Sequence, residues 1–293
     1  DSSDVIVATL FLCVSTTASL KLMPLRFIAL NEDIIPKTQI FTQPGWHDDK
    51  FIYPISPDGN YICKRNNVDY KELFDTRGEK SAWTQKLAEV TATGSHSFLK
   101  AVVIGAAWTA PLLKILHLPN FCLHIQGARN FAKTPLLKFA MSAYGNPAET
   151  YLLRSFDSSP KNRVAMAVAM NDLPQALDEL ETLSPKETAE LQKSVYDYVS
   201  GMDGQKKQRN GEVREVTRFR GVRITTGERP ILDQNAKGGA LKHCITLHID
   251  KPLIRRRGST STAQILRKKF RTLRTRLDRR LYTDTRRPDP QRL

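Results

Sequence analysis

The strongest chemical signal in this 293-residue sequence is the loop from Gly127 to Thr134. It fits the phosphate-loop pattern G-x-x-x-x-G-K-[ST], except that Ala132 stands where the second glycine is usual. In such a loop, backbone N–H groups surround phosphate oxygens, Lys133 would reach the β- and γ-phosphates of ATP, and Thr134 would hold Mg²⁺. The eight residues alone fit equally a chance loop that contains a lysine.

Two further polar groups follow at the ends of apolar runs. Asp178 and Glu179 come after Leu173–Leu177 and would supply an aspartate to the Mg²⁺ shell and a glutamate that activates water. Thr226 ends the run Val222–Thr226, where its hydroxyl would sense the γ-phosphate or position the water. Each group alone also fits solvated acids or a simple polar loop. The ordered set of three is much rarer by chance and predicts an ATPase.

These groups need strands and helices to bring them together. Phe121–Ile125 is rich in β-formers and precedes the loop, whereas Leu136–Tyr144 has helical periodicity and follows it. Asn162–Met170 predicts a second helix, and the capping box at Ser184 begins a third. Strands alternating with helices as far as Ile245–Ile249 predict an α/β fold with a mainly parallel sheet and flanking helices. Together with the three ordered motifs they predict a P-loop NTPase, and the family resemblance given below implies its RecA/AAA+-like form.

The residues before the loop predict smaller units. Short β-type runs at Gln39–Phe41, Phe51–Pro54 and Tyr61–Cys63 are separated by turn residues. Ser81–Thr91 and Ser97–Leu116 read as helices, the second apolar enough to be buried between layers. The predicted organisation is a poorly defined segment (1–37), a small β-rich subdomain (38–75), connecting helices (76–119), a P-loop ATPase core (120–250) and a basic tail (251–293).

Positive charge is concentrated in two places. The chain has 45 Lys and Arg against 30 Asp and Glu, a net charge of +15, but residues 251–293 hold 15 of these bases and only 3 of the acids. The second cluster surrounds the turn Asn210-Gly211, a strong hairpin signal. Its seven bases are Lys206, Lys207, Arg209, Arg214, Arg218, Arg220 and Arg223. A basic hairpin would contact DNA phosphates without sequence preference, although a solvated surface hairpin fits the same pattern.

The basic tail leaves its own alternatives open. Leu266, Phe270 and Leu273 begin a helical spacing of apolar residues among arginines, which fits a basic amphipathic helix that touches nucleic acid or a partner. An unordered or out-of-frame terminus fits equally well, so no site is assigned there.

Several other classes of function are disfavoured by the sequence. The 4 cysteines are scattered without a C-x-x-C pair, and the 6 histidines form no metal-binding motif. No G-x-S-x-G element is present. The apolar runs are shorter than the roughly 20 residues of a membrane helix. The sequence does not begin with Met, and no basic stretch precedes the apolar run Val5–Val14. We therefore expect a cytoplasmic protein without signal peptide or membrane contact, and a sequence that is a fragment of a longer product.

At several points the sequence resembles a known family. The pieces are Pro44-Gly45-Trp46-His47, Gly78-Glu79-x-x-Ala82-Trp83, His124-Ile125-Gln126-Gly127 through Lys133-Thr134, Tyr144-Gly145-Asn146-Pro147, Asn171-Asp172-Leu173-Pro174, Leu177-Asp178-Glu179-Leu180 and Thr225-Thr226-Gly227-Glu228. In this order they resemble the helicase-like ATPase domain of uncharacterised function in replication (primase-helicase) proteins of plasmids, phages and integrative elements. Members are similar to ring helicases of the minichromosome maintenance type, which also use alanine before the phosphate-loop lysine.

The resemblance implies a function and its partners. It implies an ATP-dependent DNA helicase or translocase of a mobile element that binds single-stranded DNA and works with a primase or other replication proteins. It also implies assembly as a homo-oligomeric ring, with a hexamer as the expected form. Lys242 stands where the family usually has an arginine that reaches a neighbour's nucleotide, and lysine is the weaker clamp. Gln175 interrupts the acid-bearing strand. The alternative is therefore a catalytically degraded nucleic-acid-binding or assembly module with the same fold.

Overall fold

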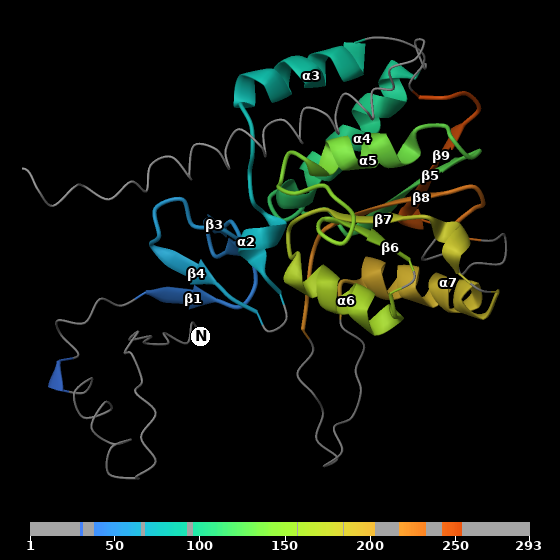
Figure 1. The fold of residues 1–293 in the computed structure, drawn as a ribbon. Helices are drawn as coiled ribbons and strands as arrows, with labels where there is room; N and C mark the ends of the chain where they lie inside the picture. Colours follow the sequence, from blue (N-terminus) through green and yellow to red (C-terminus); the bar gives the residue numbers. More distant parts are fainter. Residues whose placement is uncertain are drawn as a thin grey trace, which may run out of the picture.

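A five-stranded parallel sheet organises the chain (Figure 1). In the computed structural model, the described residues are 30–31, 38–65, 68–92, 96–156, 158–183, 185–202, 217–232 and 242–253. The strands of the sheet are β5 (Phe121–Gly127), β6 (Leu153–Ser155), β7 (Gln175–Asp178), β8 (Val222–Gly227) and β9 (Cys244–Ile249). Their spatial order is β6-β7-β8-β5-β9, and every neighbouring pair is parallel. The predicted α/β fold is confirmed.

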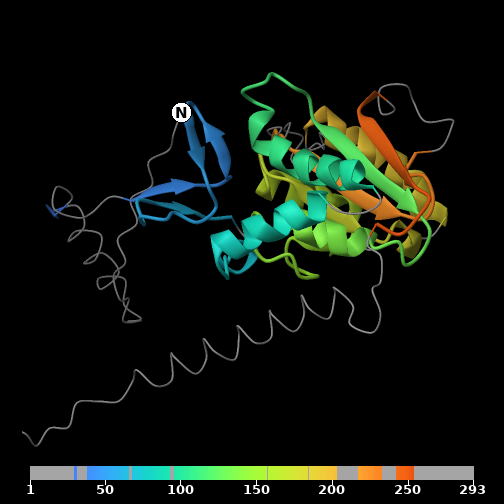
Figure 2. The ribbon, with the colours of Figure 1, turned by 90° about the horizontal axis from the view of Figure 1, so that it is seen from above.

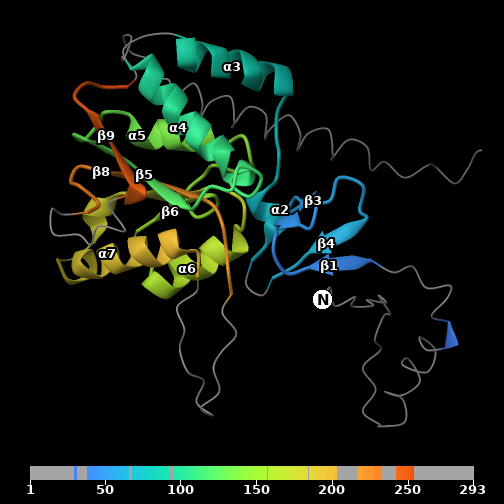
Figure 3. The ribbon, with the colours of Figure 1, turned by 180° about the vertical axis from the view of Figure 1, so that it is seen from behind.

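Helices cover both faces of this sheet, as two opposite views show (Figures 1 and 3). On one face lie α4 (Ser97–Thr109) and α5 (Lys133–Met141), with α3 (Lys80–Ala92) packed on α4. The other face carries α6 (Pro160–Ala169) and α7 (Pro185–Ser200). Short 3₁₀ turns, η1 (Ala110–Leu112) and η2 (Leu180–Thr182), follow α4 and β7. With both faces covered, the central strands can be apolar throughout.

Strand alternation assigns the side chains of the sheet to two hydrophobic cores. Leu123 of β5 and Ile224 of β8 belong to the core under α4 and α5, whereas Cys122 and Leu177 belong to the core under α6 and α7. Successive side chains of a strand point to opposite faces. Asp178 therefore shares the α5 face, and His124 shares the α6–α7 face.

The N-terminal strands form two small sheets beside the main one (Figure 2). β1 (Gln39–Phe41) pairs in parallel with β4 (Tyr61–Cys63), and β2 (Gly45–His47) pairs antiparallel with β3 (Lys50–Ile52). The short helix α2 (Tyr70–Leu73) follows. Its buried residues join the same hydrophobic core as α4 and α5, so these strands dock on the main sheet without a separate core.

Helix boundaries differ from the predicted ones near residue 110. The helix expected over Ser97–Leu116 ends at Thr109, and Pro111 in η1 explains the stop because proline has no N–H for a helical bond. Only one face of α4 is buried: Val103 and Ala107 are in the core, whereas Phe98 is 75% exposed. None of the described helices is long and apolar enough to span a bilayer.

Candidate nucleotide site

The three polar groups predicted from the sequence lie at the carboxyl ends of adjacent strands. β7, β8 and β5 are neighbours in the sheet, and the phosphate loop, the acid pair and the threonines all lie at the carboxyl edge. Ligands of open parallel sheets bind at this edge, where the strand order reverses. Here the reversal is at β5, which has β8 on one side and β9 on the other.

Lys133 starts α5 and folds back over the phosphate loop. Its Nζ donates to the carbonyl oxygens of Gly127 (2.5 Å) and Ala128 (3.0 Å). Partial burial lowers the pKa of Lys133, and the carboxylates of Glu181, Glu228 and Asp178 oppose this shift. The ammonium group is thus held at the mouth of the loop by weak carbonyl partners, where a phosphate would bind it more strongly.

Two small residues shape the loop. A Cβ at Gly127 would lie 3.0 Å from the carbonyl oxygen of Ile249, so glycine permits the close pairing of β5 and β9. Ala132 has a φ of 64° and caps α5 without a side-chain bond. A left-handed conformation costs a residue with a Cβ about 1–2 kcal/mol, and glycine would avoid that cost.

The acid pair meets Thr226 directly. The buried hydroxyl of Thr226 donates to Oδ1 of Asp178, and the Glu179 amide donates to the same hydroxyl oxygen at 3.4 Å. Thr226 therefore orients the aspartate from beneath. Glu179 itself has a φ of 61° and an exposed side chain. Backbone strain of this kind collects at functional sites.

The donors at this edge fit Mg²⁺. The candidate ligands Thr134 and Asp178 offer oxygen atoms, which Mg²⁺ prefers, and Mg²⁺ takes only one or two protein ligands when phosphates supply the rest. Among the described residues, no group of three or more His, Cys, Asp or Glu side chains is placed to hold a metal.

Two residues of this edge were not predicted as part of the site. His124 is fully buried in β5, with Nδ1 2.8 Å from Thr225 Oγ1 and Nε2 2.9 Å from the Arg229 carbonyl oxygen. Glu181 accepts hydrogen bonds from the amides of Glu228 and Arg229. Its only sequence signal is its position three residues after Asp178, and the turn η2 brings it back to the edge.

A comparison with models of protein families shows to which family this chain belongs. The model of a domain of unknown function, DUF927, matches residues 12–218. The chain belongs to the DUF927 family. No curated protein matches the chain significantly.

Solved structures show the fold of this DUF927 chain. One is described as "SCCmec type IV Cch - active helicase", with 16% identity, a TM-score of 0.57 and coverage of 88% of this chain. The chain spans about half of that protein, 48% of its length. A second, a crystal structure of JCV helicase with a bound acetamide compound, has 13% identity over 72% of this chain and 60% of that one, and its TM-score of 0.25 carries no argument. The fold is therefore helicase-like.

Lys242 lies far from the phosphate loop of its own DUF927 chain. It is exposed and stands just before β9, at the amino edge of the sheet. The 7 residues of β5 separate this edge from the loop, about 20 Å along the strands. Its predicted role at a neighbouring subunit's nucleotide stays a prediction.

The predicted DNA-contacting bases Lys206, Lys207, Arg209 and Arg214 lie outside the described residues. The two ends of their segment are described and lie together, because Met202 and Arg218 form an antiparallel bridge and the Phe219 amide donates to the Gly201 carbonyl at 2.9 Å. The described residues on either side of the basic segment therefore lie together near the amino end of β8.

The prediction that Arg223 belongs to a DNA-contacting basic cluster is wrong. Its side chain is 1% exposed, with the guanidinium carbon 3.9 Å from the centre of the Tyr198 ring and Nε donating to Gln175 Oε1 at 2.8 Å. Arg223 lies in a strand covered on both faces, so it cannot contact DNA phosphates. Gln175 also does not interrupt β7: it is the first residue of the strand and the hydrogen-bond partner of Arg223.

Two other motifs of the family resemblance, the one around Trp46 and the one that begins with Asn171, contact each other at the amino edge of the sheet. The Trp46 amide donates to Asp172 Oδ2, and Asn171 Nδ2 donates to the Pro44 carbonyl, both at 3.0 Å. Gly45 has a φ of 102°, and a Cβ there would lie 2.5 Å from Asp172 Oδ2. We call this contact between the β2 motif and the Asn171-Asp172 turn the clasp. It fastens the N-terminal strands to the main sheet.

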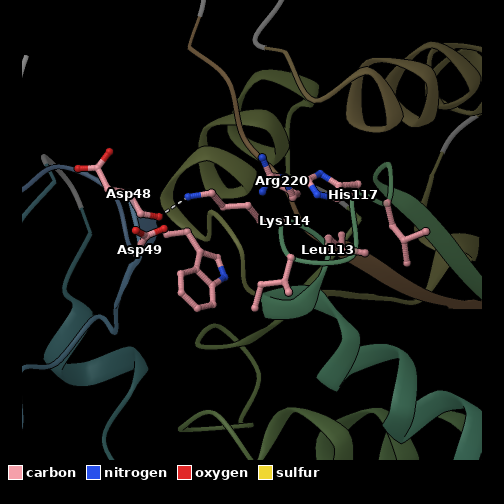
Figure 4. A pocket seen from close by; sticks show the side chains of 9 residues that line it. Asp48, Asp49, Leu113, Lys114, His117 and Arg220 are labelled. Atoms are coloured by element: carbon pink, nitrogen blue, oxygen red, sulfur yellow. Dashed lines mark hydrogen bonds between the residues drawn. The ribbon is translucent and has the colours of Figure 1, made fainter.

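A cleft of about 620 Å³ opens beside the clasp (Figure 4). Asp48 and Asp49 line one side, and Lys114, His117 and Arg220 line the other. The Lys114 ammonium donates to the Asp48 carbonyl oxygen across the opening. Because the walls carry opposite charges, the cleft does not present a uniformly basic surface to DNA.

Proposed function

We propose that this chain is an ATP-dependent DNA helicase or translocase module. The observation that carries the proposal is the meeting of the phosphate loop, the acid pair and Thr226 at one edge of three adjacent parallel strands. Similarity in fold to a protein described as an active helicase supports it. The family resemblance adds a role in the replication of a mobile element. It also adds assembly as a ring, contact of Lys242 with the nucleotide of a neighbouring subunit, and a primase as a partner.

In this proposal each residue has a separate task. Lys133 and the amides of the phosphate loop would bind the phosphates of ATP, with Gly127 and Ala132 allowing the backbone to approach. Asp178 and Thr134 would hold Mg²⁺, which supplies charge neutralisation on the phosphates when bound. Glu179 would take the proton of the attacking water.

Hydrolysis by the full chain tests the catalytic part. We expect Lys133→Ala to abolish ATP binding, measured with a fluorescent nucleotide, and Glu179→Gln to retain binding while reducing kcat about 100-fold or more. Single-stranded DNA should raise the wild-type rate. Binding without turnover in the wild type, with DNA present, would instead support the rival function, a degraded assembly or DNA-binding module. The lysine at position 242, where the family usually has an arginine, is the observation that favours this rival.

DNA binding needs its own experiment. If four bases of the 203–216 segment contact phosphates, log Kd for single-stranded DNA should change with log salt with a slope of about 3, at roughly 0.7 counterions per contact. Replacing Lys206, Lys207 and Arg209 with alanine should flatten this slope. The control removes residues 254–293, leaving Leu253, which is buried and bonds to Phe131. Loss of binding only in this control would move the DNA site to the tail.

A further inference from the structure

Strand β8 is fastened to the phosphate-loop strand at both of its ends. At the amino end, Asn120 accepts from the Gly221 amide at 3.0 Å and donates to the Tyr198 and Phe219 carbonyls at 3.1 and 3.3 Å. At the carboxyl end, His124 contacts both Thr225 and the Arg229 carbonyl. Both side chains are buried. Only His124 lies at the edge that carries the candidate nucleotide site.

The Arg229 carbonyl defines which nitrogen of a neutral His124 ring carries the proton. A carbonyl oxygen can only accept, so Nε2 donates to it, and Nδ1 of the neutral ring accepts from the Thr225 hydroxyl. Burial lowers the pKa of His124 to about 4, which keeps the ring neutral near pH 7. The ring is a fixed bridge between β5 and the end of β8.

The residues after β8, Gly227 to Arg229, are called the β8 turn here, and they are held from a second side by η2. Glu181 Oε1 accepts from the Glu228 amide and, at 3.3 Å, from the Arg229 amide. Arg229 Nη2 returns two bonds of 3.3 Å to the carbonyls of Leu180 and Leu183. A Cβ at Gly227 would lie about equally close to Glu181 and His124, 3.1 Å from each. The turn is thus clamped between β5 and η2.

The clamped turn adjoins the groups that the proposed chemistry needs. Thr226 immediately precedes it and donates to Asp178. Glu181 and Glu228 are also the carboxylates that most strongly raise the pKa of Lys133 against its burial. Moving the β8 turn would therefore displace Thr226 and change the field at the lysine.

We propose that His124 and Glu181 are positioning residues of the ATPase site, which hold the β8 turn so that Thr226 keeps Asp178 oriented. Neither side chain touches substrate in this role. The inference rests on the proposed function and adds to it a pair of residues outside the phosphate loop and the acid pair.

Kinetics of the full chain give the first test. His124→Leu removes both bonds of the ring, and Glu181→Ala removes both accepted bonds. Because a shift of about 1 Å at reacting groups costs up to 100-fold, we expect kcat to fall about 10- to 100-fold while KM for ATP changes less than about 3-fold. His124→Gln keeps a donor for Arg229 and Glu181→Gln keeps an acceptor, so both should recover most of kcat.

The matched control is Asn120→Ala. It removes buried hydrogen bonds between the same two strands at the far edge, and should lower thermal stability while leaving kcat per folded molecule unchanged. A loss of kcat in Asn120→Ala equal to that in His124→Leu would show that general loosening of the sheet, not positioning of the turn, causes the effect.

Hydrogen–deuterium exchange provides a readout that does not depend on activity. The amides of Glu228 and Arg229 should exchange about 10-fold faster or more in Glu181→Ala and His124→Leu, and at the wild-type rate in Asn120→Ala. Unchanged exchange in both site variants overturns the positioning role. Absence of ATP hydrolysis by the unmodified chain would instead contradict the proposed function, so the two failures are distinguishable.

Discussion

The two edges of the main sheet use similar residues for different purposes. At the amino edge, Asp172 accepts from the Trp46 amide and from Asn171, and pairs with Arg220 at 3.7 Å, so its bonds join separate parts of the chain. At the carboxyl edge, Asp178 accepts a hydrogen bond from Thr226 within the sheet, and its carboxylate raises the pKa of Lys133 in the phosphate loop against the effect of burial. Asp172 joins the N-terminal strands to the main sheet, whereas Asp178 is the aspartate that would hold Mg²⁺ under the proposed function.

The largest difference between the edges should appear when these aspartates are changed. We expect Asp178→Asn to reduce kcat for ATP hydrolysis about 100-fold or more, because the proposed metal ligand loses its charge. Asp172→Asn should keep kcat per folded molecule but lower the free energy of unfolding by about 1–3 kcal/mol, since it weakens a buried hydrogen-bonded group. Steady-state kinetics and urea denaturation measure the two. Equal effects on kcat would contradict the division of labour.

Replacing one glycine at each edge with alanine tests how tightly the backbone is packed there. Gly45→Ala should destabilise the chain by about 3 kcal/mol, because it adds a Cβ to a residue with φ of 102° and places it 2.5 Å from Asp172 Oδ2. Gly127→Ala should cost less stability, since its φ is not left-handed and its nearest contact is 3.0 Å. Thermal unfolding of both variants checks the order. A larger loss for Gly127→Ala would show that the clasp is not the stiffer contact.

Acid should weaken the carboxyl edge through His124. Its pKa is lowered from 6.5 to about 4 in the folded chain by burial, while the facing charges are Glu181, which opposes the shift, and Lys133 and His248, which add to it. Below pH 6.5 the unfolded state therefore binds a proton at His124 that the folded state does not bind. His124 makes its full contribution to the free energy of unfolding above pH 6.5, and this contribution falls by about 3 kcal/mol as the pH drops to about 4.

Denaturation curves of the wild type and His124→Gln between pH 7 and 4 test this expectation. The difference in unfolding free energy between them should shrink as the pH falls, because the glutamine does not titrate. A difference that stays constant over this range would contradict a buried neutral imidazole.

The smallest expected effect concerns Ala132. Ala132→Gly should stabilise the chain by at most about 1 kcal/mol, because relief of the left-handed strain at φ of 64° is partly offset by the greater freedom of glycine in the unfolded chain. Thermal denaturation detects a change of this size. A clear loss of stability would show that the Cβ of Ala132, which packs on the main core, contributes more than the strain costs.

Patterns local in the sequence predicted much of this architecture. The β5, β8 and β9 runs, the start of α7 and the loop at Gly127 were predicted in place, because strand-forming apolar runs, caps and turn residues act over a few neighbours. The alternation of strands and helices predicted a mainly parallel sheet, and the structure places β7, β8 and β5 side by side in it. The residue roles at the nucleotide edge remain predictions.

Long-range contacts were beyond such patterns. Arg223 had the same sequence signature as the other bases of its cluster, and only pairing with Gln175 and packing on Tyr198 buried it. The sequence does not distinguish Glu181 from a surface acid. In the structure, η2 places it where it accepts hydrogen bonds from the amides of the β8 turn. Partners of this kind are separated by tens of residues, so no local signal encodes them.

The sequence by itself therefore determined the strands, the order of the motifs and the chemistry available at each, because propensity and alternation depend on near neighbours. Only the tertiary structure decided which polar residues work together. It joined Asp178 to Thr226, His124 to the β8 turn, and Trp46 to Asp172, and it placed Lys242 at the edge away from its own phosphate loop. The physical reason is that parallel strands bring distant segments to the same edge, where buried polar atoms must find partners.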